Sequence, residues 1–325
     1  MDVFNSFLIA LNAVIPIACL MGLGWCLVHF KVIDREFARK GNKWAFSAFL
    51  PVTFFNTLRK ANFGASFRAD TLLYIIIALL VCSAIGFILG AFVIKTPNQK
   101  GVFAQAVIRT NVVVFGLPIA KSIYDISELT TMVLALAIAA PLLNLLSVVA
   151  LGVYPDEESG HKVKVDIKQL LLSIIKNPII VGTALGAIVN VVFNRFDITM
   201  YPAIDSVLTT VGGLATPILL IFVGALLTFD NLKKYSKIVT GYTALRLIIL
   251  PLAVTLIAIA FGMRGVDLAV TMLMFATPAP VATVGMAAGQ KKDSVLAGLL
   301  VAVPSLISVV TIFLFIFILR LTSMI

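Results

Sequence analysis

Two arginines fall where a membrane-spanning helix would bury them, and buried arginines of this kind bind anions. Arg109 follows Lys100 by nine residues and Arg246 follows Lys237 by nine, which places each about 13 Å along a helix from its polar end. A charge at that depth costs roughly 2.5–3.5 kcal/mol to insert, so it normally faces a cavity or a partner. A guanidinium keeps its proton and holds carboxylates bidentately. The arginines therefore predict a cavity that accepts an anion.

The apolar segments contain few acidic residues that could neutralise these arginines. Asp205, near the outer end of its segment, is the nearest candidate partner. Arg109 is the stronger candidate for binding an anion because it directly precedes a helix break.

Helix-breaking residues occur near the middle of two apolar segments, within residues 105–118 and 274–283. Proline removes an amide donor and clashes with the preceding turn, so nearby backbone groups need new partners. In a membrane, irregular backbone is tolerated only inside protein or along a watery cavity. A kink explains a single proline, whereas a pair in corresponding segments indicates a binding site.

The open ends of broken helices can bind ions, anions at amide ends and cations at carbonyl ends. Asn111 and Thr277 add side-chain hydrogen bonds beside the breaks, although such residues more commonly join packed helices. The candidate substrate-binding residues are Arg109, Asn111, Gly116, Pro118, Thr277, Pro278, Pro280 and Arg246.

The composition excludes a water-soluble domain. Hydrophobic residues make up 61% of the 325 residues and charged residues 12%, with a mean hydropathy of +1.09. Several apolar runs approach or exceed the roughly 20 residues that a spanning helix needs. We expect an all-α integral membrane protein with ten spans, near 6–30, 40–58, 71–94, 101–122, 129–153, 170–192, 203–228, 238–261, 266–289 and 293–320.

The lysines and arginines favour one side of this topology, and basic loops stay cytoplasmic. Both termini are therefore expected outside the cell membrane, and the polar loop 154–168 is expected in the cytoplasm. The first apolar stretch has no basic leader and is interpreted as a retained helix. The net charge of +10 then indicates contact with anionic lipid and does not call for a nucleic-acid partner.

The loop 154–168 separates two halves with related sequences. Pro16–Gly24 matches Pro178–Gly186 at an offset of 162, and Phe115–Ala120 matches Thr277–Ala282 at the same offset. Pro51 and Pro217 correspond after a slip of four residues. Five spans per half make the repeat inverted, as in many secondary transporters. We expect one repeat over 1–153, a linker over 154–168 and a second repeat over 169–325.

The motifs around the breaks resemble the auxin efflux carrier family along nearly the whole chain. They comprise Arg109-Thr-Asn111, Gly116-Leu-Pro118, Ala244-Leu-Arg246-Leu and Thr277-Pro-Ala-Pro280. The length and short central loop are similar to those of the bacterial branch, which carries malate or malonate. The resemblance implies crossing helices four and nine beside the substrate, as in bile-acid symporter-like folds. It assigns Asn111, Gly116 and Pro118 to one crossover and residues 277–280 to the other.

These features together predict a secondary active transporter of small mono- or dicarboxylates such as malate, working by alternating access. No residue pattern forms an aromatic cage for an indole, yet an auxin-like or other organic solute stays an alternative. So does a non-transporting ligand sensor, although loop 154–168 is short for signalling. A membrane enzyme is disfavoured because no nucleophile, metal cluster or acid–base pair stands out.

The expected accessories are few. No cofactor is expected, and transport could be Na⁺ symport, H⁺ symport, exchange or plain uniport, among which the sequence does not choose. The three cysteines, Cys19, Cys26 and Cys82, fall in apolar spans and are interpreted as buried structural thiols. A homodimer remains open, since many transporters of this type dimerise.

Overall fold

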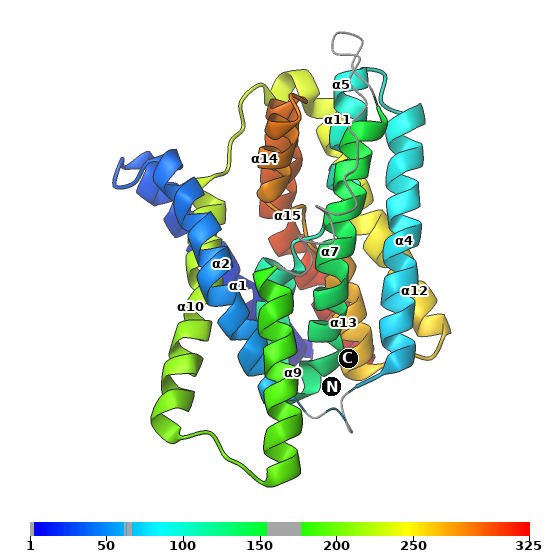
Figure 1. The fold of residues 1–325 in the computed structure, drawn as a ribbon. Coiled ribbons are helices and arrows are strands. Elements are labelled where there is room, and N and C mark those ends of the chain that lie inside the picture. Colours follow the sequence, from blue (N-terminus) through cyan, green and yellow to red (C-terminus); the bar gives the residue numbers. More distant parts are fainter. Residues whose placement is uncertain (1–2, 62, 64–66, 155–176) are drawn as a thin grey trace.

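The chain forms an assembly of long helices. The computed structural model describes residues 3–61, 63, 67–154 and 177–325, and this part of the chain contains no strand. Among the described residues, eight helical stretches are long and apolar enough to cross a membrane. An all-helical integral membrane protein fits both observations (Figure 1).

The N-terminal half consists of helices joined by short turns. Its elements are α1 (Val3–His29), α2 (Arg35–Arg59), α4 (Ala69–Phe92), α5 (Pro97–Ile108), the π-helical turn η1 (Val112–Gly116), α6 (Leu117–Ile123), the 3₁₀ turn η2 (Ile126–Leu129) and α7 (Thr130–Val153). Of the expected linker 154–168, only Tyr154 lies among the described residues.

The C-terminal half also consists of helices joined by short connections. Its elements are α9 (Pro178–Phe196), α10 (Pro202–Ala225), α11 (Leu232–Ala244), the π-helical turn η3 (Leu245–Ile249), α12 (Leu250–Ala260), α13 (Gly265–Ala276), α14 (Ala282–Gly289) and α15 (Ser294–Leu321).

Two of the ten expected spans lack a helix that meets the length and apolarity needed for crossing. The expected span 40–58 lies in α2, which is long enough but carries charges in its first turns. The expected span 266–289 is divided into α13 and α14. The other eight expected spans each overlap a helical stretch that is long and apolar enough, although one of these stretches, Pro97–Ile123, is interrupted between α5 and η1.

Side chains fix where several helices begin. Asp34 caps α2 by accepting a 2.6 Å hydrogen bond from the Phe37 amide, and Asp293 caps α15 by accepting from Leu296 at 2.9 Å. Such caps pair amides that have no partner inside the helix. Asp34 therefore starts α2 at Arg35, five residues before the span expected from hydropathy.

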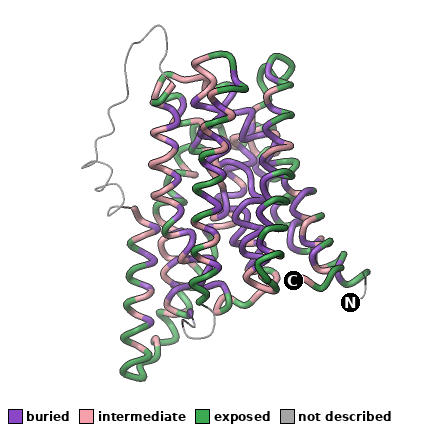
Figure 2. The backbone as a smooth tube through the Cα atoms, turned by 90° about the vertical axis from the view of Figure 1, so that its right-hand side faces the viewer, coloured by how far each residue is buried: buried purple, intermediate pink, exposed green. Residues whose placement is uncertain are grey.

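The helices form two groups. The four-helix group comprises α1, α2, α9 and α10, in which α1 packs on α10 and α2 packs on both α9 and α10. The crossing bundle comprises α4–α7 and α11–α15. The two groups meet most extensively where α1 packs on α15, and also where α1 packs on α6 and α7 packs on α2 and α9. Buried residues concentrate in the middle of the molecule, and both chain ends lie at the same end of it (Figure 2).

Glycines let the helices of the four-helix group approach closely. A methyl group added to Gly24 of α1 would overlap the Ile221 carbonyl oxygen of α10, and one added to Gly186 of α9 would overlap the Phe55 carbonyl oxygen of α2. Small residues at such contacts are the usual means of helix association in membranes.

The three cysteines do not share one environment. Cys82 is buried, Cys26 is half-buried and Cys19 is exposed. The expectation of buried thiols is confirmed for Cys82 and wrong for Cys19, because Cys19 lies on the outward side of α1, where an apolar side chain suits surrounding lipid.

Replacing Gly24 by alanine tests the close approach of α1 and α10. We expect the Gly24→Ala protein to lose about 1–3 kcal/mol of stability, as overpacked interiors do, and therefore to melt at a lower temperature in detergent. Gly22→Ala on the same helix is the matched control, because nothing lies within 4 Å of its added methyl group. Equal melting temperatures for the two variants would contradict the tight contact.

Candidate functional site

The first broken helix opens at Arg109. Helix α5 ends at Ile108, and Arg109 has extended backbone angles, φ −80° and ψ 143°. After Asn111 the chain turns through η1 and continues as α6, with Pro118 in its first turn. Because η1 runs directly into α6, Pro118 lies in continuous helical backbone just after the π-helical turn, where the hydrogen-bond pattern already departs from that of an α-helix.

The second broken helix opens at Thr277. Helix α13 ends at Ala276, Thr277 is extended with φ −90° and ψ 151°, and α14 begins at Ala282. Pro280 accepts a 2.9 Å hydrogen bond from the Thr283 amide, which closes the turn that starts α14. Helices α5 and α13 both have 12 residues. Their breaks begin at positions 109 and 277, which are 168 residues apart. This separation exceeds the offset of 162 in the sequence match by six residues.

The two breaks contact each other in the interior. The Asn111 amide donates to the Pro278 carbonyl oxygen at 2.8 Å. The hydroxyl oxygens of Thr110 and Thr277 lie 2.6 Å apart, and the Thr110 hydroxyl donates to the Met274 carbonyl oxygen at 3.0 Å. Backbone and side-chain groups freed by one break are thus paired by the other.

Arg246 joins the ends of the two half-helices. Its Nε donates to the Thr277 carbonyl oxygen at 3.0 Å and its Nη1 to the Val107 carbonyl oxygen at 3.5 Å. The side chain is 1% exposed, and its Nη2 has no hydrogen-bond partner in the described part of the chain. One turn earlier, the Tyr242 hydroxyl donates to the Ala106 carbonyl oxygen at 3.0 Å. These carbonyls are the ones that a helix end leaves unpaired.

Arg109 points toward α14 and lies in a small polar cluster. Its Nη1 donates to the Met286 sulfur at 2.7 Å, and Gln105 Nε2 donates to the same sulfur at 3.4 Å. Gln105 Oε1 and the Thr283 hydroxyl are buried without hydrogen-bond partners among the described residues. We call Gln105, Arg109, Thr283 and Met286 the Met286 cluster. The Gln105 and Arg109 donors in this cluster have only the Met286 thioether as an acceptor there, and thioether sulfur accepts hydrogen bonds weakly.

Neither Arg246, which is buried, nor Arg109, which is only half-buried, is paired with an acid among the described residues. Within the described ranges, no carboxylate lies within ion-pair distance of Arg109 or Arg246. Asp205, the expected candidate, instead pairs with Arg59 and Lys60 between α2 and α10. Its position in the first turn of α10 places it in the four-helix group, away from the crossing bundle.

The predicted site residues divide into two sets. We call the place where the two breaks contact each other the crossing. Five predicted residues lie there or contact the helix ends beside it: Arg109, Asn111, Thr277, Pro278 and Arg246. Pro118 and Pro280 start the following helices, and Gly116 is a packing position. A methyl group on Gly116 would lie 2.7 Å from Val112 Cγ1 and 3.4 Å from the Leu273 carbonyl oxygen.

Other contacting residues gave weak sequence signals. Thr110 is noticeable only because it lies between Arg109 and Asn111. Met286 and Thr283 have no distinctive spacing, and Tyr242 is recognisable only as one helical turn before Arg246.

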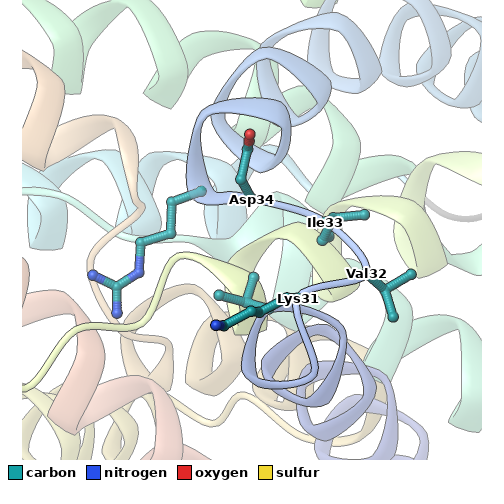
Figure 3. A pocket seen from close by; sticks show the side chains of 6 residues that line it. Lys31, Val32, Ile33 and Asp34 are labelled. Atoms are coloured by element: carbon teal, nitrogen blue, oxygen red, sulfur yellow. The ribbon is translucent and has the colours of Figure 1, made fainter.

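A surface hollow of about 700 Å³ lies at the turn between α1 and α2. It is lined by residues of that turn alone, from Val28 to Arg35, four of which are labelled in Figure 3. Asp34 there is already engaged as the α2 cap. No side chain of the crossing lines this hollow, so the breaks are the better candidate site.

A family model described as Membrane transport protein matches residues 9–316, a range that includes both breaks and extends from within α1 to within α15. No curated protein matches the chain.

Removing the Thr110 hydroxyl tests the contact between the breaks. Thr110→Val keeps the side-chain shape but loses two hydrogen bonds, so we expect a stability loss of about 0.6–2 kcal/mol, the range measured for such bonds in membrane proteins. Thermal unfolding in detergent measures it. Thr110→Ser retains the hydroxyl and serves as control; if valine and serine variants unfold alike, the hydroxyl contributes nothing at the crossing.

Proposed function

This chain belongs to the auxin efflux carrier family of membrane transport proteins, and from that premise we propose that it is a secondary transporter of small organic anions. Members of this family are transporters and not enzymes. The proposed cargo is a mono- or dicarboxylate such as malate, carried across the cell membrane by alternating access.

The observation that supports an anionic cargo most directly is the unpaired positive charge beside the first break. Arg109 lies in the Met286 cluster and donates to the Met286 thioether. Among the described residues, no carboxylate lies within ion-pair distance of it. A guanidinium in a membrane interior is costly unless a partner compensates it. A cargo carboxylate supplies the missing negative charge in a bidentate geometry.

The Met286 sulfur occupies the position that we propose for a cargo oxygen. Thioether sulfur is a weak acceptor, whereas charge-assisted hydrogen bonds to a carboxylate are roughly twice as strong as neutral ones. Binding would displace Met286, whose unbranched side chain adapts readily. The buried Gln105 and Thr283 oxygens could then meet hydroxyl groups of the cargo.

The packing of the four-helix group supports two inverted five-helix repeats and the division at 1–153 and 169–325. Gly24 contacts Ile221, and Gly186 contacts Phe55. Gly186 follows Gly24 by 162 residues and Ile221 follows Phe55 by 166, the same offset and slip found in the sequence. The α1–α10 contact is thus the counterpart of the α9–α2 contact. Relative movement of the four-helix group and the crossing bundle would expose the breaks alternately.

Loss of the Arg109 charge is expected to weaken cargo binding. A hydrogen bond to a charged group contributes about 1.5–3 kcal/mol, so Arg109→Ala should reduce apparent affinity roughly ten- to a hundredfold. The assay is uptake and counterflow of labelled malate and other small carboxylates in proteoliposomes, with Na⁺ and H⁺ gradients imposed separately. Arg195→Ala removes an exposed arginine at the end of α9 and is the matched control.

Replacing Met286 separates the proposed acceptor from the donor. Met286→Leu removes the competing sulfur and should leave cargo affinity unchanged or higher, while Met286→Glu should pair Arg109 permanently and stop anion uptake. If the wild-type protein moves no carboxylate under any gradient, the anion proposal fails for these cargoes. Ligand binding without flux would favour a sensor, and uptake of an indole acid an auxin-like cargo.

The proposed orientation places both termini outside and the 154–168 loop in the cytoplasm. In a cysteine-free background, Asp197→Cys after α9 should react with an impermeant maleimide applied to intact cells, whereas Asn231→Cys before α11 should react only after permeabilisation. These positions lie at opposite ends of α10. The reverse labelling pattern would invert the topology.

A further inference from the structure

The crossing brings two carbonyl ends of helices to one buried side chain. Val107 lies in the last turn of α5, and Thr277 directly follows α13. Each helix end carries a partial charge of about −0.5 from its unpaired carbonyls. Two such ends facing one another in a low-dielectric interior repel, so they require a positive group between them.

Carbonyl-bearing ends of broken helices are the places where transporters coordinate coupling cations. Here the position between the two ends is taken by the Arg246 guanidinium, which donates to the Thr277 oxygen at 3.0 Å and to the Val107 oxygen at 3.5 Å. Its single positive charge balances the two partial charges of about −0.5.

Arg246 is a permanent occupant of this position. Arginine keeps its proton under physiological conditions, and the side chain is 1% exposed. Within the described residues no carboxylate pairs with it, so the helix ends are its counter-charges. Arg246 also lies in the π-helical turn η3, from Leu245 to Ile249, and turns of this kind are frequent at functional sites.

We propose that Arg246 acts as a tethered cation, filling the place between α5 and α13 that a coupling Na⁺ would otherwise take. Transport through the crossing then needs no bound monovalent cation, and removing the guanidinium creates a site that a free cation can fill. The transport consequence rests on the proposed function, whereas cation binding by the variant does not. Arg246 is in these terms a positioning residue for the two broken helices.

The first experiment follows thermal unfolding of purified protein in NaCl, KCl or choline chloride at constant ionic strength. Wild type should have the same midpoint in all three salts. Arg246→Ala should have a lower midpoint in choline chloride and a saturable rise with Na⁺ or with millimolar methylguanidinium. Arg246→Lys retains a point charge and should respond less to added cation than the alanine variant.

Arg264→Ala is the matched control for the loss of one arginine. Arg264 also donates to carbonyl oxygens, those of Ile259 and Met263 at 3.0 and 2.6 Å, but it is exposed. This variant should show no specific response to Na⁺ or methylguanidinium. A loss of stability in Arg246→Ala that no cation restores would overturn the proposal and leave Arg246 as packing alone.

Wild-type measurements keep the proposal testable if Arg246→Ala does not fold. Replacing Na⁺ by choline should change neither its unfolding midpoint nor its carboxylate uptake, and Na⁺-stimulated uptake or Na⁺ stabilisation of wild type would overturn the proposal. In liposomes, Na⁺ should restore uptake to Arg246→Ala at least in part. If no carboxylate moves in any sample, the proposed function fails, while the unfolding series still decides the role of Arg246.

Discussion

A peptide group that leaves the helical pattern inside a membrane has no water to bond with, and this constraint determines the centre of the protein. Two helices break, and each break supplies what the other lacks. The Asn111 amide meets the Pro278 carbonyl oxygen, and the Thr110 and Thr277 hydroxyls pair between them. The surrounding helices of the crossing bundle keep lipid away from these groups, so the rest of the architecture follows from enclosing them.

The same constraint explains the distribution of charge. Carbonyl ends concentrate negative potential at the crossing, and Arg246 lies against them, while Arg109 points instead to the Met286 sulfur. The two arginines therefore differ in burial and in role, although each follows a lysine by nine residues in the sequence. One is held by backbone and the other by a weak, replaceable acceptor. Only the second has a partner that an incoming carboxylate would readily displace.

The sequence predicted breaks in the right two segments, and the second coincides with Pro278 and Pro280 because proline acts locally. The first break instead opens at 109–111, before Gly116 and Pro118, which lie in the continuous helix of η1 and α6. Sequence reasoning failed where the outcome depends on distant contacts. Asp205 is drawn to Arg59 and Lys60 by the packing of α2 on α10, which no spacing reveals. The hydropathy pattern did not predict the charged first turns of α2. The sequence match between the two halves gave an offset of 162, six residues less than the separation of the two breaks. The contact between Arg109 and Met286 could not be predicted, because methionine in an apolar segment has the same pattern as any other apolar residue.

The hydrogen bond from Asn111 to Pro278 joins residues separated by 167 positions, and this separation has a consequence for biosynthesis. At about 5–20 residues per second, the ribosome needs roughly ten to thirty seconds after Asn111 to produce Pro278. During that interval the first break has been made but its partner does not exist. The nascent N-terminal half must therefore wait beside water or the insertion machinery. The chain can close its membrane interior only after most of it has been synthesised.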